Sequence, residues 1–166
     1  MGLGKEYAMH MKVATLALIV RDGKLLLGVK KRDAEIGGNT LNGPGGKLDP
    51  GESLLECVIR ETEEEVGLRI HVTEDDKRAV ITFHNGEKSV WEVHVYLITS
   101  FEGEPTPTEA MTPRGSWWYS LNKLPYTRHM LASDRKWMPK IFAGERFTAR
   151  VLQSDDAKKF IDIAFD

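Results

Sequence analysis

Apolar residues occur along the chain in short runs that are typical of strands and in one longer stretch with helical spacing. The stretch from Lys12 to Val20 is apolar and β-rich, and a second run extends from Leu25 to Val29 after an Asp-Gly pair. Such a pair between two apolar runs predicts a β-hairpin. The polar segment from Lys30 to Gly46 then contains Gly37-Gly38 and Gly43-Pro44-Gly45-Gly46. These glycine-rich turns indicate a loop, which is able to contact a ligand.

The longest helical pattern lies between Ser53 and Val66, a segment without Gly or Pro. Its apolar residues recur at the spacing of one buried helix face. They are Leu54, Leu55, Val58, Ile59 and Val66. Gly67 follows at the position where helices commonly end in a left-handed residue. The pattern therefore predicts the principal helix over 53–66.

Further along the chain, three segments have the composition of strands. They are Arg69 to Val72, Ala79 to His84 and Trp91 to Thr99. The segment from Glu102 to Ser116 is rich in Pro, Thr and Gly, which indicates a loop. A second helix is predicted from Lys136 to Ala143.

The last segment, Thr148 to Asp166, has no assigned place in this pattern. Within it, Gln153-Ser154-Asp155-Asp156 is typical of a turn, and Lys158 to Ala164 is compatible with a final strand or a short helix. Strands and helices in this order imply packed layers, with a mixed sheet and an α/β fold class. A chain of 166 residues fits one domain, so we expect a single domain over 1–166.

The charge balance excludes some classes of function. Acidic residues number 25 and basic residues 23, so net charge favours neither nucleic-acid polymers nor anionic membranes. The lone cysteine, Cys57, cannot form an internal disulfide, and Val13 to Val20, the longest apolar run, is shorter than the roughly 20 residues of a membrane span. We expect a cytoplasmic protein with a small-molecule partner. Monomer and homodimer both stay open.

Three glutamates lie close together on the predicted principal helix. Glu61 and Glu65 are one turn apart and Glu64 is their neighbour, so the three carboxylates converge on one side. Like charges at this spacing cost about 0.2–0.5 kcal/mol per pair, and a divalent cation between them would remove that repulsion. Oxygen ligands suit Mg²⁺ or Mn²⁺. The alternative is a solvated acidic helix face that binds no metal.

The residues around these glutamates form a longer motif. Gly46 is followed after five residues by Glu52, and after seven more by Arg60-Glu61-Thr62-x-Glu64-Glu65-x-Gly67-Leu68. This frame, over 46–68, resembles the Nudix box. It departs from the box at Thr62, where the family usually has a larger aliphatic residue, and we expect a small loss of packing there.

The resemblance implies a Nudix-type α/β/α sandwich with a mixed β-sheet, and hydrolysis of a pyrophosphate bond in a nucleotide with Mg²⁺, or Mn²⁺ in its place. The implied metal ligands are Glu61, Glu64, Glu65 and the backbone carbonyl of Gly45, with Glu109 from a later loop as a further candidate. Arg60 would orient the carboxylates by an ion pair, and Glu52 would support the box from the start of the helix. Glu61 or Glu65 would activate or position the attacking water.

Outside the box, several segments resemble the MutT-type Nudix members that hydrolyse oxidised purine nucleoside triphosphates such as 8-oxo-dGTP to the monophosphate and pyrophosphate. The matching segments are Leu26 to Arg32, Leu41 to Lys47, Val93-His94-Val95, Leu124-Pro125 and Trp137-Met138-Pro139. This implies a role in preventing DNA damage. The expected substrate-binding residues are Thr15, Lys30, Asn42, Gly45, Gly46, Trp91 and Asp134. A protonated Asp134 in a buried pocket could donate to a purine carbonyl or N7.

Two departures from this subgroup leave the substrate open. Leu131 stands where the subgroup has a stacking Trp, and Ser133-Asp134 stands where it has paired Asp residues. Losing an aromatic platform removes about 1–3 kcal/mol of base stacking. One alternative is therefore a Nudix pyrophosphatase for ADP-ribose, a nucleotide sugar or another nucleoside diphosphate derivative. Another is a catalytically silent nucleotide-binding module.

Overall fold

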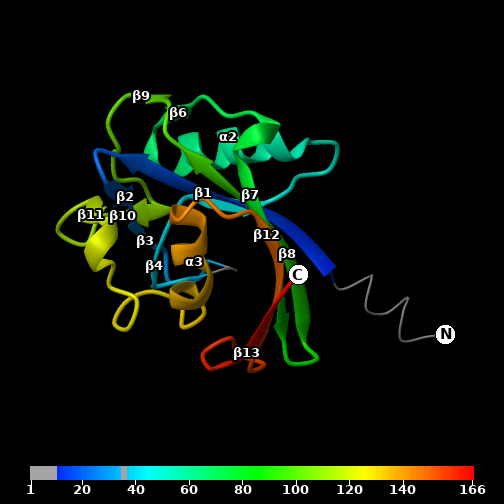
Figure 1. The fold of residues 1–166 in the computed structure, drawn as a ribbon. Coiled ribbons are helices and arrows are strands. Elements are labelled where there is room, and N and C mark those ends of the chain that lie inside the picture. Colours follow the sequence, from blue (N-terminus) through cyan, green and yellow to red (C-terminus); the bar gives the residue numbers. More distant parts are fainter. Residues whose placement is uncertain (1–10, 35–36) are drawn as a thin grey trace.

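The computed structural model describes residues 11–34 and 37–166, and its centre is an eight-stranded sheet (Figure 1). Its strands run in the order β11-β2-β1-β8-β7-β12-β13, and β5 pairs with β1. The strands of this sheet are β1 (Met11–Arg21), β2 (Lys24–Leu26), β5 (Gly45–Lys47), β7 (Lys77–Asn85), β8 (Ser89–Ile98), β11 (Trp118–Ser120), β12 (Phe147–Gln153) and β13 (Phe160–Phe165). β1 and β8 are parallel, as are β7 and β12, whereas β7 and β8 are antiparallel. The sheet is thus mixed, as predicted.

Smaller elements surround this sheet. A three-stranded sheet contains β10 (Met111–Thr112), β3 (Gly28–Lys30) and β4 (Leu41–Asn42), and β6 (Arg69–Ile70) pairs with β9 (Phe101–Glu102). The helices are α2 (Leu54–Val66), α3 (Asp134–Phe142) and two short 3-10 helices, η1 (Glu74–Asp76) and η2 (Leu121–Lys123). In the part of the chain that the structure describes, no helix is long and apolar enough to span a membrane.

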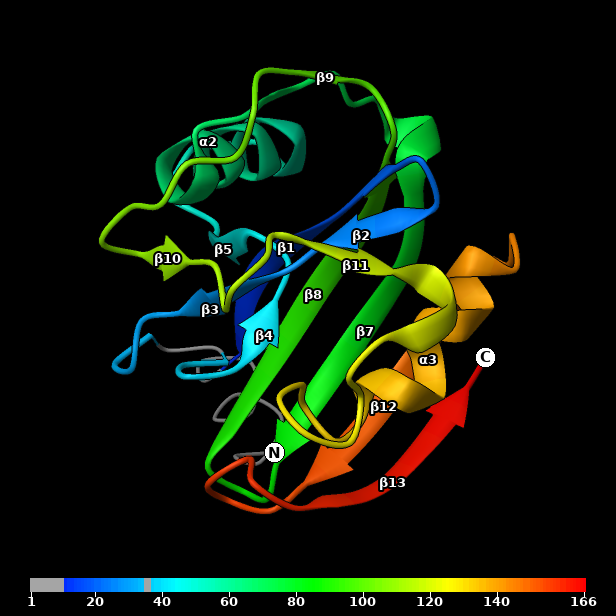
Figure 2. The same ribbon diagram turned by 90° about the vertical axis from the view of Figure 1, so that its left-hand side faces the viewer.

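The two α-helices cover opposite faces of the sheet (Figure 2). Successive side chains of a strand point to opposite faces, and β8 shows this directly. Its residues Val93 and Val95 join the core that contains Trp137 of α3, whereas Tyr96 joins the core that contains Val58 of α2. Two cores separated by one sheet form the predicted α/β/α sandwich.

The first hairpin forms at the predicted Asp-Gly turn. Arg21 pairs with Lys24, and Asp22 and Gly23 both have positive φ angles, 53° and 73°. Two consecutive positive φ angles match the twist of the flanking strands, which explains why the turn is Asp-Gly. The predicted second strand, 25–29, is divided into β2 and β3, with Leu27 between them.

Local sequence explains both ends of α2. The Ser53 side chain accepts from the backbone N–H of Glu56, and the Glu56 side chain accepts from the backbone N–H of Ser53, each at 3.1 Å. This capping box satisfies two backbone donors at the helix start. Gly67 ends the helix in the left-handed region, with φ 74°. Thr62 is fully buried and its hydroxyl donates to the carbonyl of Val58 at 2.7 Å, so its polar group is satisfied.

Other boundaries differ from the predicted ones. α3 begins at Asp134 rather than at Lys136, and strands β4 and β10 lie within the two predicted loops. The C-terminal segment contributes β12 and β13, which resolves the choice at 158–164 in favour of a strand. Its position depends on pairing with β7, more than 60 residues earlier in the chain. Local patterns do not report such distant pairing.

We predict that Ser53→Ala lowers the free energy of unfolding by about 1 kcal/mol, because it removes the side-chain acceptor at the start of α2. Urea unfolding at neutral pH measures this change. Ser100→Ala, an exposed site, is the control and should stay within about 0.5 kcal/mol of the wild type. Equal values for the two variants would contradict the role of this cap.

Candidate active site

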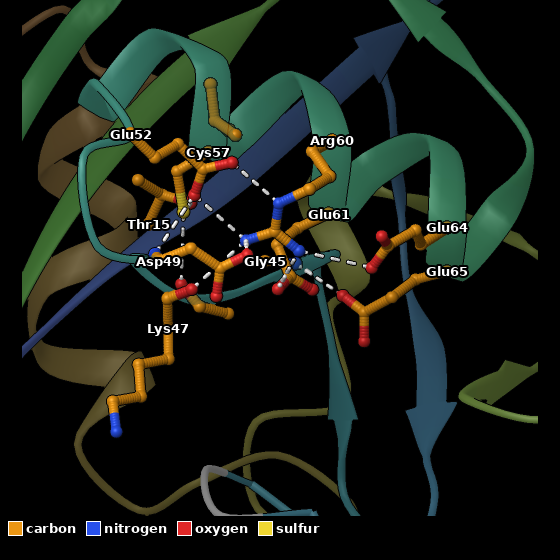
Figure 3. Close-up of polar contacts among 12 residues, drawn as sticks. Thr15, Gly45, Lys47, Asp49, Glu52, Cys57, Arg60, Glu61, Glu64 and Glu65 are labelled. Atoms are coloured by element: carbon orange, nitrogen blue, oxygen red, sulfur yellow. Dashed lines mark hydrogen bonds and ion pairs between the residues drawn. The ribbon is translucent and has the colours of Figure 1, made fainter.

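The guanidinium of Arg60 is surrounded by carboxylates from α2 and from the loop that precedes it (Figure 3). Its Nε donates to Glu52 Oε2 at 2.6 Å and its Nη2 donates to Glu52 Oε1 at 3.0 Å. Its Nη1 donates to Glu61 Oε1 at 2.9 Å and to Glu64 Oε2 at 3.2 Å. Asp49 lies 3.4 Å from Nη2. One cation thus brings together residues from the loop before α2 and from the helix itself.

The contacts of Arg60 change the proton affinities of the groups it touches. The hydrogen bond from Arg60 lowers the pKa of Glu52 to about 2, and the hydrogen bond to Glu52 raises the pKa of Arg60. Both residues are therefore charged at every physiological pH. The bidentate pair fixes the guanidinium plane, which in turn orients the carboxylates of Glu61 and Glu64.

Gly46 lets the helix carboxylates approach the loop backbone. A Cβ atom at this position would lie 2.6 Å from the carboxyl carbon of Glu61, which is closer than side-chain atoms pack. The neighbouring Gly45 donates its backbone N–H to Glu65 Oε1 at 2.7 Å. The two glycines of the motif therefore provide the close approach of strand β5 to α2.

A second charged pair, Lys30 and Glu65, is buried beside Gly45. Lys30 Nζ donates to the carbonyl oxygen of Gly45 at 2.8 Å and lies 3.7 Å from Glu65 Oε2. Both side chains are buried, at 6% and 9% exposure. Burial raises the pKa of Glu65, although Lys30 and the Gly45 N–H oppose that shift. Lys30 thus holds the backbone of the glycine loop.

Most of the predicted substrate-binding residues line one pocket, here called the central pocket. It is lined by Thr15, Leu16, Lys30, Asn42, Gly45, Gly46, Phe83, Val93, Leu131, Asp134 and Trp137. The Thr15 hydroxyl lies 3.3 Å from Cys57 Sγ, and Asn42 Oδ1 accepts from the backbone N–H of Gly43 at 2.9 Å. Trp91 lies outside it, in an adjoining pocket that shares Phe83, Val93 and Leu131 with it.

Five lining residues were not among the predicted site residues, namely Leu16, Phe83, Val93, Leu131 and Trp137. Two of them, Phe83 and Trp137, are aromatic. Phe83 and Ile81 are two residues apart on β7 and lie on the same face, a pattern that indicates a buried face but not a pocket. Trp137 lies in α3, within the helix predicted over 136–143. Neither position carried a signal that separates a pocket wall from a core residue.

Asp134 contributes an unusual polar group to the central pocket. It is 2% exposed, and among the residues described its Oδ2 atom has no hydrogen-bond partner. Burial raises its pKa to about 8, so the carboxyl keeps its proton at neutral pH. A protonated carboxyl donates one hydrogen bond and also accepts. The site therefore offers a buried donor to a ligand.

Glu109 lies in the exposed loop between β9 and β10. The adjacent Thr108 donates its hydroxyl to the carbonyl oxygen of Glu65 at 2.8 Å, which attaches this loop to the end of α2. The loop thus approaches the acidic helix. No described contact involves the Glu109 side chain.

The donor atoms suit a hard divalent cation, although they are not gathered around one point. Within residues 11–34 and 37–166, no three His, Cys, Asp or Glu side chains converge as metal ligands. Glu61 and Glu64 share Arg60, and Glu65 contacts the Gly45 N–H. Among the residues described, five carboxylates nevertheless face the two cations Arg60 and Lys30, namely Asp49, Glu52, Glu61, Glu64 and Glu65. This excess of negative oxygen ligands fits Mg²⁺ or Mn²⁺.

A family model described as the NUDIX domain matches residues 9–142. The chain therefore belongs to the NUDIX family and is a hydrolase of pyrophosphate bonds. This confirms the family resemblance of the motif over 46–68. The fold and the position of the motif on β5 and α2 agree with that assignment.

The chain is similar to proteins named oxidized purine nucleoside triphosphate hydrolase. The relative from Danio rerio is 35% identical over 136 residues, which cover 82% of this chain and 83% of the relative. The relative from Mus musculus is 31% identical over 137 residues, with the same coverage of 82% and 83%.

Solved structures show the same fold. A mutator MutT protein from Bacillus halodurans has a TM-score of 0.76 and 22% identity, with 93% of this chain and 97% of that chain covered. A MutT NUDIX hydrolase from Burkholderia pseudomallei has a TM-score of 0.67 and 30% identity, with 79% and 98% covered.

We predict that Asp134 makes folding stability fall with rising pH. Its ordinary pKa is 3.8 and its pKa in the folded protein is about 8. Between these values the unfolded chain releases the proton and the folded protein retains it, so the free energy of unfolding decreases as pH rises. Asp134→Asn, which is neutral and similar in shape, should lose this decrease.

The two proteins are compared by urea unfolding at about pH 5 and about pH 8, two values that bracket most of the titration window. The stability advantage of Asp134→Asn over the wild type should be larger at the higher pH. The exposed Asp162→Asn variant is the control and should follow the wild-type curve. Parallel curves for wild type and Asp134→Asn would show that Asp134 ionises normally.

Proposed function

We propose that the protein hydrolyses an oxidised purine nucleoside triphosphate, such as 8-oxo-dGTP, to the monophosphate and pyrophosphate with Mg²⁺. The observation that carries this proposal is that the central pocket and the acidic face of α2 meet at Gly45-Gly46. These glycines line the central pocket with Asn42 and Asp134, and they also contact the acidic face of α2. A base bound in the pocket would therefore place its phosphates toward the carboxylates. The names of the relatives in Danio rerio and Mus musculus support this substrate class.

In this proposal the metal would be held by Glu61, Glu64 and Glu65, with the Gly45 carbonyl and Glu109 as further ligands. When bound, Mg²⁺ neutralises phosphate charge and polarises the phosphorus centre. Binding requires that some carboxylate oxygens turn from their present partners.

The chain's own residues would supply position and proton transfer. Arg60, oriented by Glu52, keeps Glu61 and Glu64 at the edge of the loop. Glu61 or Glu65 accepts the proton of the attacking water. Burial raises the pKa of Glu65, which makes its carboxylate the more basic. The leaving pyrophosphate departs toward solvent on the exposed side of α2.

The base would be recognised in the central pocket. Asn42 can offer a donor and an acceptor, and protonated Asp134 can donate to a purine carbonyl. Trp91 and Phe83 provide aromatic surface beside Leu131, the position that lacks an aromatic ring. This arrangement fits a planar, hydrogen-bonding base.

Leu131 favours a second candidate, a Nudix pyrophosphatase for ADP-ribose or a nucleotide sugar. Leu131 lines both the central pocket and its neighbour, so a substrate with weaker stacking demands would also fit there.

We predict that Glu64→Gln and Glu65→Gln each lower kcat/KM by about 100-fold or more, on the scale of losing one electrostatic contact to the transition state. Initial rates of pyrophosphate release with Mg²⁺ measure the loss. Glu63→Gln is the matched control, since Glu63 lies exposed on the same helix and its activity should stay near that of the wild type. Full activity in either variant would remove the metal assignment. Nucleotide binding by the wild type without any Mg²⁺-dependent product would instead revive the silent binding module.

We also predict selective, Mg²⁺-dependent turnover of an oxidised purine in a panel of 8-oxo-dGTP, 2-oxo-dATP, normal dNTPs, ADP-ribose and a nucleotide sugar. Coupled pyrophosphatase detects triphosphate cleavage, and coupled phosphatase detects cleavage of the diphosphate derivatives. Preference for an oxidised purine supports nucleotide-pool sanitation. Weak rates on all triphosphates with strong turnover of a diphosphate derivative would establish the second candidate instead.

A further inference from the structure

A polar row crosses one end of the sheet, on the face that packs against α3. Phe83 of β7 is paired with Val151 of β12, and both contribute to the core beneath α3. Two residues further along, Asn85 is paired with Gln153 in the same parallel register, and Ser89 of β8 pairs with Asn85. Alternation places Asn85 and Gln153 on the same face as the apolar pair before them. The apolar face thus ends in a row of side-chain amides.

Hydrogen bonds join these side chains in a chain that runs from Gln153 through Asn85 to Ser89. Gln153 Nε2 donates to Asn85 Oδ1 at 2.8 Å, and Asn85 Nδ2 donates to Ser89 Oγ at 3.0 Å. Gln153 is 5% exposed. Gln153 also lines a pocket, so its amide oxygen is placed to accept a hydrogen bond from a ligand there.

The two amides line a pocket with aromatic walls, here called the amide pocket. It is lined by Gly37, Phe83, Asn85, Trp91, Val93, Leu131, Gln153 and Ala157. Trp91 is 6% exposed, and Lys12 Nζ lies 5.1 Å from the centroid of its ring. Because Phe83, Val93 and Leu131 also line the central pocket, the two hollows are neighbours with a common wall. A base in the central pocket would extend toward the amides.

Resting on the proposed function, we infer that Gln153 is a specificity-determining residue that accepts a hydrogen bond from the N7–H of the oxidised base. Oxidation of a purine at C8 gives a lactam in which N7 carries hydrogen, whereas N7 of a normal purine is only an acceptor. A carbonyl oxygen accepts a hydrogen bond from the N7–H of the oxidised purine, but it is repelled by the N7 lone pair of a normal purine. The Nε2 group of Gln153 already donates to Asn85 Oδ1, so its Oε1 atom is the one left to face a ligand.

A cycle of protein and substrate changes tests this contact. Gln153→Met is nearly isosteric and removes the acceptor. It is compared with the wild type on 8-oxo-dGTP and on its 7-deaza analogue, which lacks the N7–H, both with Mg²⁺. The wild type should lose about 3- to 10-fold in kcat/KM on the analogue, mainly through KM, as expected for one neutral hydrogen bond.

Gln153→Met should show that loss already on 8-oxo-dGTP and should not distinguish the two substrates. The exposed Asn122→Met variant is the control and should keep wild-type sensitivity. If Gln153→Met does not fold, Gln153→Glu replaces it, and because it keeps an acceptor oxygen it should retain the sensitivity. A loss of sensitivity in Gln153→Glu, or wild-type sensitivity in Gln153→Met with only a lower Tm, overturns the inference.

The same measurements separate this inference from the proposed function. A wild type that turns over 8-oxo-dGTP, with a Gln153→Met variant as sensitive to N7–H as the wild type, defeats only the role of Gln153. A wild type that does not turn over 8-oxo-dGTP defeats the proposed function, and the inference falls with it.

Discussion

The ion pair between Arg60 and Glu52 is the contact on which the site depends. Without its bidentate partner, Arg60 would be a flexible cation among several carboxylates. With Glu52 fixed at 2.6 Å, the guanidinium has one orientation and holds Glu61 and Glu64 within hydrogen-bond distance. The low pKa of Glu52, about 2, shows how strongly the pair favours the charged state. A cluster of like charges is thereby made compatible with a stable helix.

The ion pair could not place these carboxylates beside a ligand unless the backbone came close to them. That approach needs Gly46, where a Cβ atom would collide with Glu61, and it needs the Gly45 N–H, which Glu65 accepts. Lys30 then binds the Gly45 carbonyl from the pocket side. The charged helix and the central pocket therefore share one strand, β5, and a shift in that strand would disturb both.

Sequence predicted those parts of the molecule whose determinants are local. The Asp-Gly turn, the limits of α2 and the spacing from Gly46 to Gly67 depend on residues close together in the chain. The start of α3 and the role of β12 do not, because Asp134 lies in a pocket lined by residues from distant segments and β12 is placed by parallel pairing with β7. Parallel strands meet only through long connections, so no short pattern announces their register.

Gln153 shows why a site residue on such a strand escapes sequence reasoning. In isolation Gln153-Ser154 resembles the start of a turn, and an amide there is normally solvated. Pairing with Asn85 turns the same residue into a buried group at the end of an apolar face. A similar argument holds for Asp134 and Trp137, whose Oδ2 and Nε1 atoms have no partner among the residues described. An unsatisfied buried polar atom costs about 1–3 kcal/mol. A fold that keeps two of them at the central pocket, on Asp134 and Trp137, is better suited to a polar ligand that satisfies them than to an empty core.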